Sequence, residues 1–191
     1  MNKLSDYLFF RVNHVCPRWL CFTFDNILRR LVQNPYEVLN PYIKEGDIVL
    51  DVGPGIGYFT IPAAEMVGDK GLVIAADVQP QMLHAISKRA QRRGLLQRIE
   101  LKLSSANSLG VEAKVDFILA FWMVHEVPDK RRLFSQLRFL LKDKGSFLMV
   151  EPQFHVNKKN FDESLRLAGQ IGFVFDKSPQ ISLSRSALLR I

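Results

Sequence analysis

Cysteine and long apolar runs are scarce in this chain of 191 residues. Its two cysteines, Cys16 and Cys21, cannot form the disulfide framework of a small secreted domain. The longest strongly apolar stretch, residues 117–124, has eight residues, whereas a membrane-spanning helix needs roughly 20. The first residues also lack the hydrophobic region and cleavage site of a signal peptide. These absences predict a soluble, cytoplasmic protein without a membrane span.

Strong compositional bias is missing as well. Apolar residues make up 48% and charged residues 24% of the chain, which argues against disorder and against repetitive fibrous structure. Lysine and arginine outnumber aspartate and glutamate by 26 to 19, giving a net charge of +7. A basic balance favours an anionic partner, and charge alone does not choose between nucleic acid, nucleotide and lipid headgroup. The length favours one domain with a short appendage.

The first 45 residues differ from the rest of the chain in being rich in aromatic side chains without strand-like alternation. We expect short helices and loops there. Asn34 followed by Pro35 and by Glu37 has the order of a helix start, with a cap, a proline at the first position and an acid in the first turn. Pro41 is expected to end that helix.

From residue 48 onward, short apolar runs alternate with segments of helical period, a pattern typical of parallel strands buried on both faces. The predicted strands are residues 48–51, 72–76, 99–103, 115–120 and 146–150. Apolar residues at helical spacing lie between or after them, namely Met82, Ile86 and Ala90; Leu133, Leu137 and Leu141; and Phe161, Leu165 and Ala168. Residues 173–176 and 180–191 predict a closing antiparallel hairpin. The fold class is therefore α/β, with a Rossmann-like doubly wound sheet of seven strands.

A glycine-rich loop follows the first predicted strand. In Asp51-Val52-Gly53-Pro54-Gly55-Ile56-Gly57 the glycines allow a sharp turn and a close approach of a ligand. Position 58 is tyrosine, so the loop departs from the Gly-x-Gly-x-x-Gly dinucleotide pattern, which argues against NAD. Asp77 ends the second strand, where a carboxylate can bind both hydroxyls of a ribose. The alternative is a plain tight turn with Asp77 capping the next helix.

Together these motifs resemble the class I S-adenosylmethionine-dependent methyltransferases, in the small-molecule type 11 or UbiE-like branch. The resemblance covers about residues 35–152 and includes Leu140 to Ser146, similar to the family's Leu-Lys-Pro-Gly-Gly turn, and Glu151-Pro152. It implies S-adenosylmethionine as cofactor, with no metal. The residues that match cofactor-binding positions are Asp51, Gly53, Gly55, Gly57, Asp77, Val78, Ser105, Ala106, Asn107 and Phe121. Ser105 stands where the family often has an acid.

The segment after the fourth strand is similar to the family's Leu-His-His-Val-Pro-Asp motif. The resemblance places Trp122 and His125 beside the acceptor, and His125 is the candidate base or orienting donor. The competing interpretation is that both side chains only pack. Residues 1–45, including Trp19, are the candidate substrate lid ahead of a methyltransferase domain at 46–191. His14 with Cys16 and Cys21 forms no recognisable metal site.

We therefore expect methyl transfer from S-adenosylmethionine to a small, apolar or aromatic acceptor. The chain lacks the Asn/Asp-Pro-Pro-Tyr/Phe signature of amino-directed nucleic-acid methyltransferases and a cysteine for transfer to cytosine C5. An RNA methyltransferase remains the first alternative. A basic cluster could serve it or could simply be a solvated helix face; its members are Lys88, Arg89, Arg92, Arg93, Arg98 and Lys102. A cofactor-binding regulatory module without catalysis is the second. The oligomeric state is left open.

Overall fold

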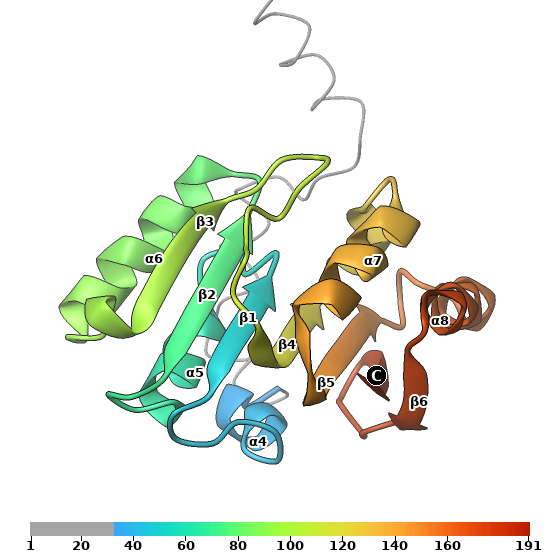
Figure 1. The fold of residues 1–191 in the computed structure, drawn as a ribbon, viewed down its shortest axis with the longest axis horizontal. Coiled ribbons are helices and arrows are strands. Elements are labelled where there is room, and N and C mark those ends of the chain that lie inside the picture. Colours follow the sequence, from blue (N-terminus) through green and yellow to red (C-terminus); the bar gives the residue numbers. More distant parts are fainter. Residues whose placement is uncertain (1–32) are drawn as a thin grey trace, which may run out of the picture.

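The structure, a computed structural model, describes residues 33–191 and places their strands in one central sheet (Figure 1). The predictions for His14, Cys16, Trp19 and Cys21 lie outside the described residues. The sheet has seven strands in the order β3-β2-β1-β4-β5-β7-β6. Their bounds are β1 Ile48–Val52, β2 Leu72–Asp77, β3 Ile99–Leu103, β4 Val115–Phe121, β5 Leu141–Pro152, β6 Val174–Lys177 and β7 Ser184–Arg190.

Three of the five described helices, α4, α7 and α8, begin at a side chain that caps them. The Asn34 side chain accepts a hydrogen bond from the Tyr36 amide, which confirms the predicted first helix start. Asp129 and Asn157 cap two later helices in the same way. No helix among residues 33–191 is long and apolar enough to cross a membrane. The helices are α4 Pro35–Leu39, α5 Thr60–Met66, α6 Pro80–Arg92, α7 Lys130–Leu140 and α8 Lys158–Ile171, with short 3₁₀ turns η1 Leu96–Arg98 and η2 Val124–Glu126.

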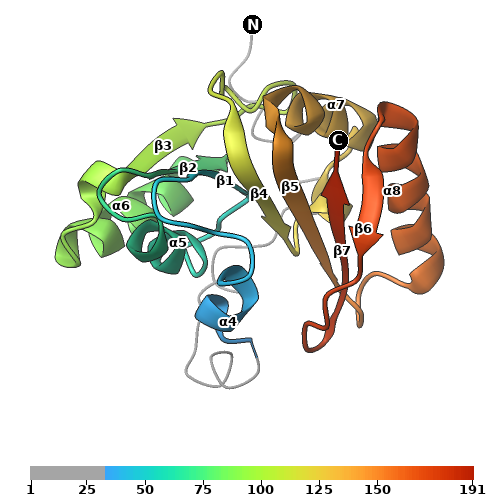
Figure 2. The same ribbon diagram turned by 60° about the horizontal axis from the view of Figure 1, so that its bottom comes forward.

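Strand pairing confirms the predicted fold class. β1 to β5 pair in parallel, and β7 runs antiparallel between β5 and β6 (Figure 2). One boundary differs from the prediction: Leu141, expected to continue a helix, has extended backbone and begins β5 five residues before Ser146. The reason is tertiary, because Leu141 pairs with Val115 and packs over Gly145, where an added Cβ would lie 2.6 Å from Leu141 Cδ1.

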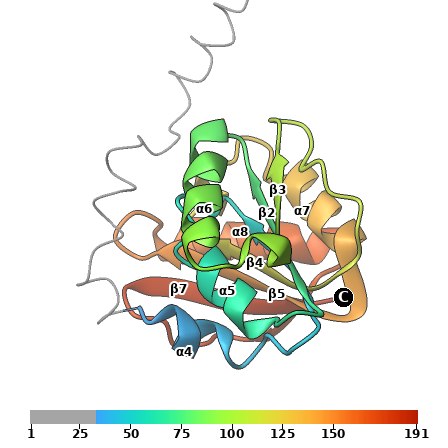
Figure 3. The same ribbon diagram turned by 90° about the vertical axis from the view of Figure 1, so that its left-hand side faces the viewer.

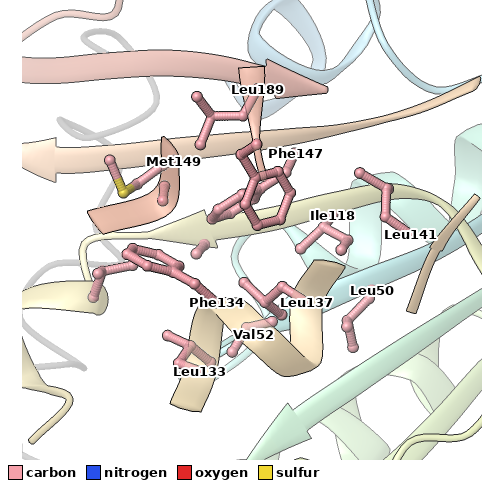
Figure 4. Close-up of a cluster of buried hydrophobic side chains, with 14 of the residues drawn as sticks. Leu50, Val52, Ile118, Leu133, Phe134, Leu137, Leu141, Phe147, Met149 and Leu189 are labelled. Carbon is pink, nitrogen blue, oxygen red and sulfur yellow. The ribbon is translucent and has the colours of Figure 1, made fainter. Parts of the chain in front are cut away.

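The sheet separates two apolar cores, and Figure 3 shows α6 and α7 on opposite sides of the strands. On one side, Phe134 and Leu137 of α7 lie against Phe147 of β5 and Leu50 of β1 (Figure 4). On the other side, α4, α5 and α6 cover the alternate residues of the same strands. Burial on both faces explains why the strands read as continuous apolar runs. It also leaves polar chemistry to the carboxyl ends of the strands, where the loops lie.

Candidate cofactor and acceptor site

The glycine loop after β1 leaves room for a ligand at one position. Gly53, Gly55 and Gly57 all have positive φ angles, of 63°, 55° and 86°, which side chains rarely adopt. An added Cβ would lie 3.0 Å from Met123 Cβ at Gly53 and 3.0 Å from Ile86 Cγ1 at Gly57, so both glycines serve close packing. At Gly55 nothing lies within 4 Å of that position. Gly55 therefore lines open space, which a side chain would fill.

Asp77, at the end of β2, is joined to this loop. Its side chain is 7% exposed and accepts hydrogen bonds from the Gln79 amide at 2.8 Å and from the amides of Gly55 and Val78. Burial raises the pKa of Asp77 to about 6. Gln79, and not Asp77, occupies the cap position of α6. The carboxylate thus lies beside the Gly55 space, as a ribose-binding acid requires.

Asp51 is a second buried carboxyl group close to the first. Only 3% of Asp51 is exposed, and its Oδ2 accepts a 2.7 Å hydrogen bond from the Thr60 hydroxyl. Burial raises the pKa of Asp51 to about 7, and the negative charge of Asp77 adds to that shift. The Thr60 bond ties β1 to the first residue of α5. Two buried acids beside an open glycine favour a ligand that offers hydroxyl donors or positive charge.

The remaining predicted cofactor residues differ in their exposure and in their contacts. Residues 105–108 form an exposed turn, and the Ser104 amide donates to the Asp77 carbonyl at 2.9 Å, which holds this turn beside Asp77. The Asn107 side-chain oxygen accepts a bond from Arg132 at 2.7 Å. Phe121 is buried, with its ring 4.3 Å from the ring of Phe59. Ala106 and Asn107 therefore lie in an exposed turn beside Asp77, whereas Phe121 belongs to a buried pair of rings.

Trp122 follows β4 in a left-handed conformation, with a φ angle of 59°. Its amide donates to the Val150 carbonyl at 2.7 Å, and its indole Nε1 donates to Ser184 Oγ at 3.0 Å. These bonds join the end of β4 to β5 and β7 and fix the indole ring. A non-glycine residue in this region of φ is uncommon and persists when its surroundings determine it.

His125 lies on η2 and is held by a residue that the sequence analysis assigned no role, Glu151. The Nδ1 atom of His125 contacts Glu151 Oε2, and Glu151 Oε1 accepts the Val124 amide at 2.9 Å. Glu151 is 2% exposed at the end of β5. A buried carboxylate on Nδ1 favours the proton on that nitrogen and leaves Nε2 as acceptor. The sequence signal was the Glu151-Pro152 pair after the fifth strand.

A polar groove of about 520 Å³ opens beside His125. Its wall includes His155, whose ring lies 4.9 Å from the His125 ring, Lys130 at the start of α7, and Ser164 in the middle of α8. Within residues 33–191, no group of three His, Cys, Asp or Glu side chains could hold a metal ion. The groove therefore offers hydrogen bonding and proton exchange at the carboxyl ends of β4 and β5.

A family described as a methyltransferase domain matches residues 49–145, from β1 into the first half of β5. The chain belongs to the class I S-adenosylmethionine-dependent methyltransferases. The cofactor of this methyltransferase family is S-adenosylmethionine, and the Gly55 space with Asp77 and Asp51 fits it.

Two curated relatives and one solved structure are similar to this methyltransferase. Aklanonic acid methyltransferase DauC of Streptomyces sp. strain C5 is 33% identical over 57% of this chain and 50% of its own length. The ubiquinone/menaquinone biosynthesis C-methyltransferase UbiE of Shewanella oneidensis is 29% identical over 62% and 49%. The chain thus spans about half the length of these relatives. A methyltransferase structure from Aquifex aeolicus superposes with a TM-score of 0.80 at 23% identity, covering 92% of this chain and 98% of that one. That likeness shows the fold.

Proposed function

We propose that the chain transfers the methyl group of S-adenosylmethionine to a small, apolar or aromatic acceptor. The observation that carries the proposal is that Trp122 and His125 follow β4 and that Glu151 lies at the end of β5, at the same edge of the sheet as Gly55 and Asp77. Open α/β sheets bind their ligands at this edge.

The chemistry asks little of the protein beyond alignment. S-adenosylmethionine supplies a methyl group on a sulfonium, which leaves as a neutral thioether in an in-line displacement. The chain's task is to hold the acceptor atom in line, which proximity and orientation accomplish. Where the acceptor atom carries a proton, His125 Nε2 accepts it, while Glu151 keeps the imidazole in the required tautomer.

The relatives support an acceptor of small-molecule size. DauC is named for aklanonic acid, and UbiE for carbon methylation in ubiquinone/menaquinone biosynthesis. The basic cluster gives less support to RNA as acceptor, because three of its members lie in ion pairs. Arg93 pairs with Glu65 at 2.9 Å, Lys102 with Glu100 at 2.7 Å, and Arg98 with Asp69.

The proposal is tested with S-adenosylmethionine labelled at the methyl group. Cell extract is divided by ultrafiltration into a small-molecule fraction and a macromolecular fraction, and half of the macromolecular fraction is treated with ribonuclease. We expect S-adenosylhomocysteine to form with the small-molecule fraction and label to enter an organic-extractable product. Label in ribonuclease-sensitive material alone would favour the RNA alternative. Tight S-adenosylhomocysteine binding without product from any fraction would favour the regulatory module.

A further inference from the structure

Phe154 is an exposed aromatic ring at the end of a packed row of rings. Its side chain is 64% exposed in the loop after β5. Ring centroids are 4.3 Å apart for Phe59 and Phe121, 5.5 Å for Phe121 and Trp122, and 5.5 Å for Trp122 and Phe154. The row runs from the end of the glycine loop to the loop beyond β5. Its inner rings are buried or half-buried, and its last ring meets solvent.

The support of Phe154 is rigid on both sides. Trp122 contacts it edge to face, with ring planes at 89°, and Trp122 is itself fixed by its bond to Ser184. On the other side, the Gln153 amide donates to the Leu183 carbonyl at 3.0 Å. Leu183 is 49% exposed and has a φ angle of 59°, the same left-handed value as Trp122. The two left-handed non-glycine residues of the described chain thus flank the loop that carries Phe154, and such clustering is typical of functional sites.

The same loop places Phe154 next to the proposed base. His155, the following residue, packs its ring on His125 at 4.9 Å. Phe154 and His155 therefore contact the two side chains, Trp122 and His125, that the proposed function puts beside the acceptor. The loop thus links the two candidate acceptor contacts, with Phe154 on Trp122 and His155 in the groove beside His125.

We propose that Phe154 is a specificity-determining residue whose ring selects a planar aromatic acceptor. This inference rests on the proposed function and deepens it by naming the acceptor class. Aromatic rings prefer offset-stacked or edge-to-face arrangements, and such pairs add about a two- to tenfold gain in affinity over the burial of equal apolar area. A saturated ring of the same size gains only from burial.

Phe139 on α7 provides a matched control. It is 68% exposed, close to the value for Phe154, and the Lys114 ammonium lies 4.7 Å from its ring centroid. The test uses the full chain with saturating S-adenosylhomocysteine and titrates 2-naphthol and its saturated counterpart, decahydro-2-naphthol, by calorimetry. We expect the wild-type chain to prefer 2-naphthol severalfold, Phe154→Leu to bring the ratio of the two affinities close to one, and Phe139→Leu to leave it unchanged.

Two outcomes would overturn the inference: a wild-type chain without preference, or a preference that survives in Phe154→Leu. Both affinity comparisons are made on protein samples whose binding of S-adenosylhomocysteine has been measured first. If that binding is intact, the result bears on Phe154 alone. If the wild-type chain binds no S-adenosylhomocysteine, the proposed function fails and the inference fails with it.

Discussion

Glu151 and His125 lie 26 residues apart in the chain and meet at the carboxyl edge of the sheet, with Glu151 Oε2 against His125 Nδ1. The second oxygen of Glu151 holds the amide of Val124, in the same turn as His125. One buried carboxylate therefore fixes both the backbone of η2 and the orientation of the imidazole. Under the proposed function, Glu151 is a positioning residue and His125 is the group that exchanges the proton.

Replacing Glu151 by glutamine is expected to slow methyl transfer about 100-fold, the lower range for loss of a general base. The amide can still accept from Val124, but its NH₂ group facing Nδ1 favours the tautomer with the proton on Nε2. His125→Ala should show a similar loss, and the double variant little more. S-adenosylhomocysteine formation with the small-molecule extract measures the rates, and calorimetry should show unchanged S-adenosylhomocysteine affinity. A Glu151→Gln chain with the wild-type rate and pH profile would contradict the role.

Asp77 is expected to make cofactor affinity depend on pH. Because its pKa is raised to about 6, the carboxylate proposed to bind the ribose is ionised above that pH and becomes protonated below it. S-adenosylhomocysteine affinity should therefore be nearly constant from pH 7 to 8 and fall below about pH 6, by up to tenfold per unit. Asp77→Asn should weaken binding about tenfold at pH 8, since a hydrogen bond to a charged group contributes about 1.5 to 3 kcal/mol.

Calorimetric titrations between pH 5 and 8 measure this dependence. Asp143→Asn, at an exposed position of β5, is the matched control and should follow the wild-type curve. The Asp77→Asn curve should be flatter, and any slope left in it belongs to Asp51. Equal affinities of the wild type and Asp77→Asn for S-adenosylhomocysteine at pH 8 would show that Asp77 does not bind the cofactor.

Asp51 is expected to lower stability at neutral pH. Its pKa is about 7 in the folded chain against an ordinary value of 3.8, so folding disfavours its ionised form. The free energy of unfolding should then fall as the pH rises from about 4 to about 7, by on the order of 1.4 kcal/mol per unit from this group. Asp51→Asn retains an acceptor for the Thr60 hydroxyl and removes the charge. Urea unfolding at pH 5 and pH 8 should show a smaller difference for this variant than for the wild type, and identical differences would refute the prediction.

Gly55 can be tested against Gly94. Both have left-handed φ angles, 55° and 68°, and in both cases an added Cβ would meet nothing within 4 Å. Alanine should therefore cost each site a similar 1 to 2 kcal/mol or so of stability from backbone strain. Only Gly55→Ala is expected to weaken S-adenosylhomocysteine binding, by about tenfold, because its methyl group enters the cofactor space. Equal affinities for the two variants would show that this space is not the binding site.

The sequence predicted the parts of the molecule that local pattern determines. The apolar runs from Ile48 and Leu72 are strands, the Asn34 cap starts a helix, and the closing hairpin is antiparallel. The order of the motifs was sufficient to predict the family and its cofactor. The start of β5 was wrong because Leu141 has helical spacing in the sequence, and its pairing with Val115 across 26 residues decides its conformation.

Contacts between side chains from distant segments could not be predicted from the sequence. Glu151 lies at the end of β5 and His125 on η2 after β4, and no spacing rule connects them. Phe154 was overlooked because one phenylalanine in a loop carries no signal until its contact with Trp122 is known. The left-handed backbone of Trp122 is also unexpected, since bulky residues avoid it. These features depend on which loops the strand order brings together.

The division of the molecule by its sheet has a consequence for how such a chain can change. Tyr58 and Phe59 of the donor loop pack in the core beneath α4, α5 and α6, whereas Val124 and Val156, which flank the histidine pair, pack in the core beneath α7 and α8. The side chains after the glycine loop and those beside the histidine pair thus belong to different cores, which meet where Gly53 packs on Met123. We therefore expect substitutions in α7 and α8 to alter the proposed acceptor site with little effect on S-adenosylmethionine binding. The acceptor specificity of such a chain could then change while its cofactor stays the same.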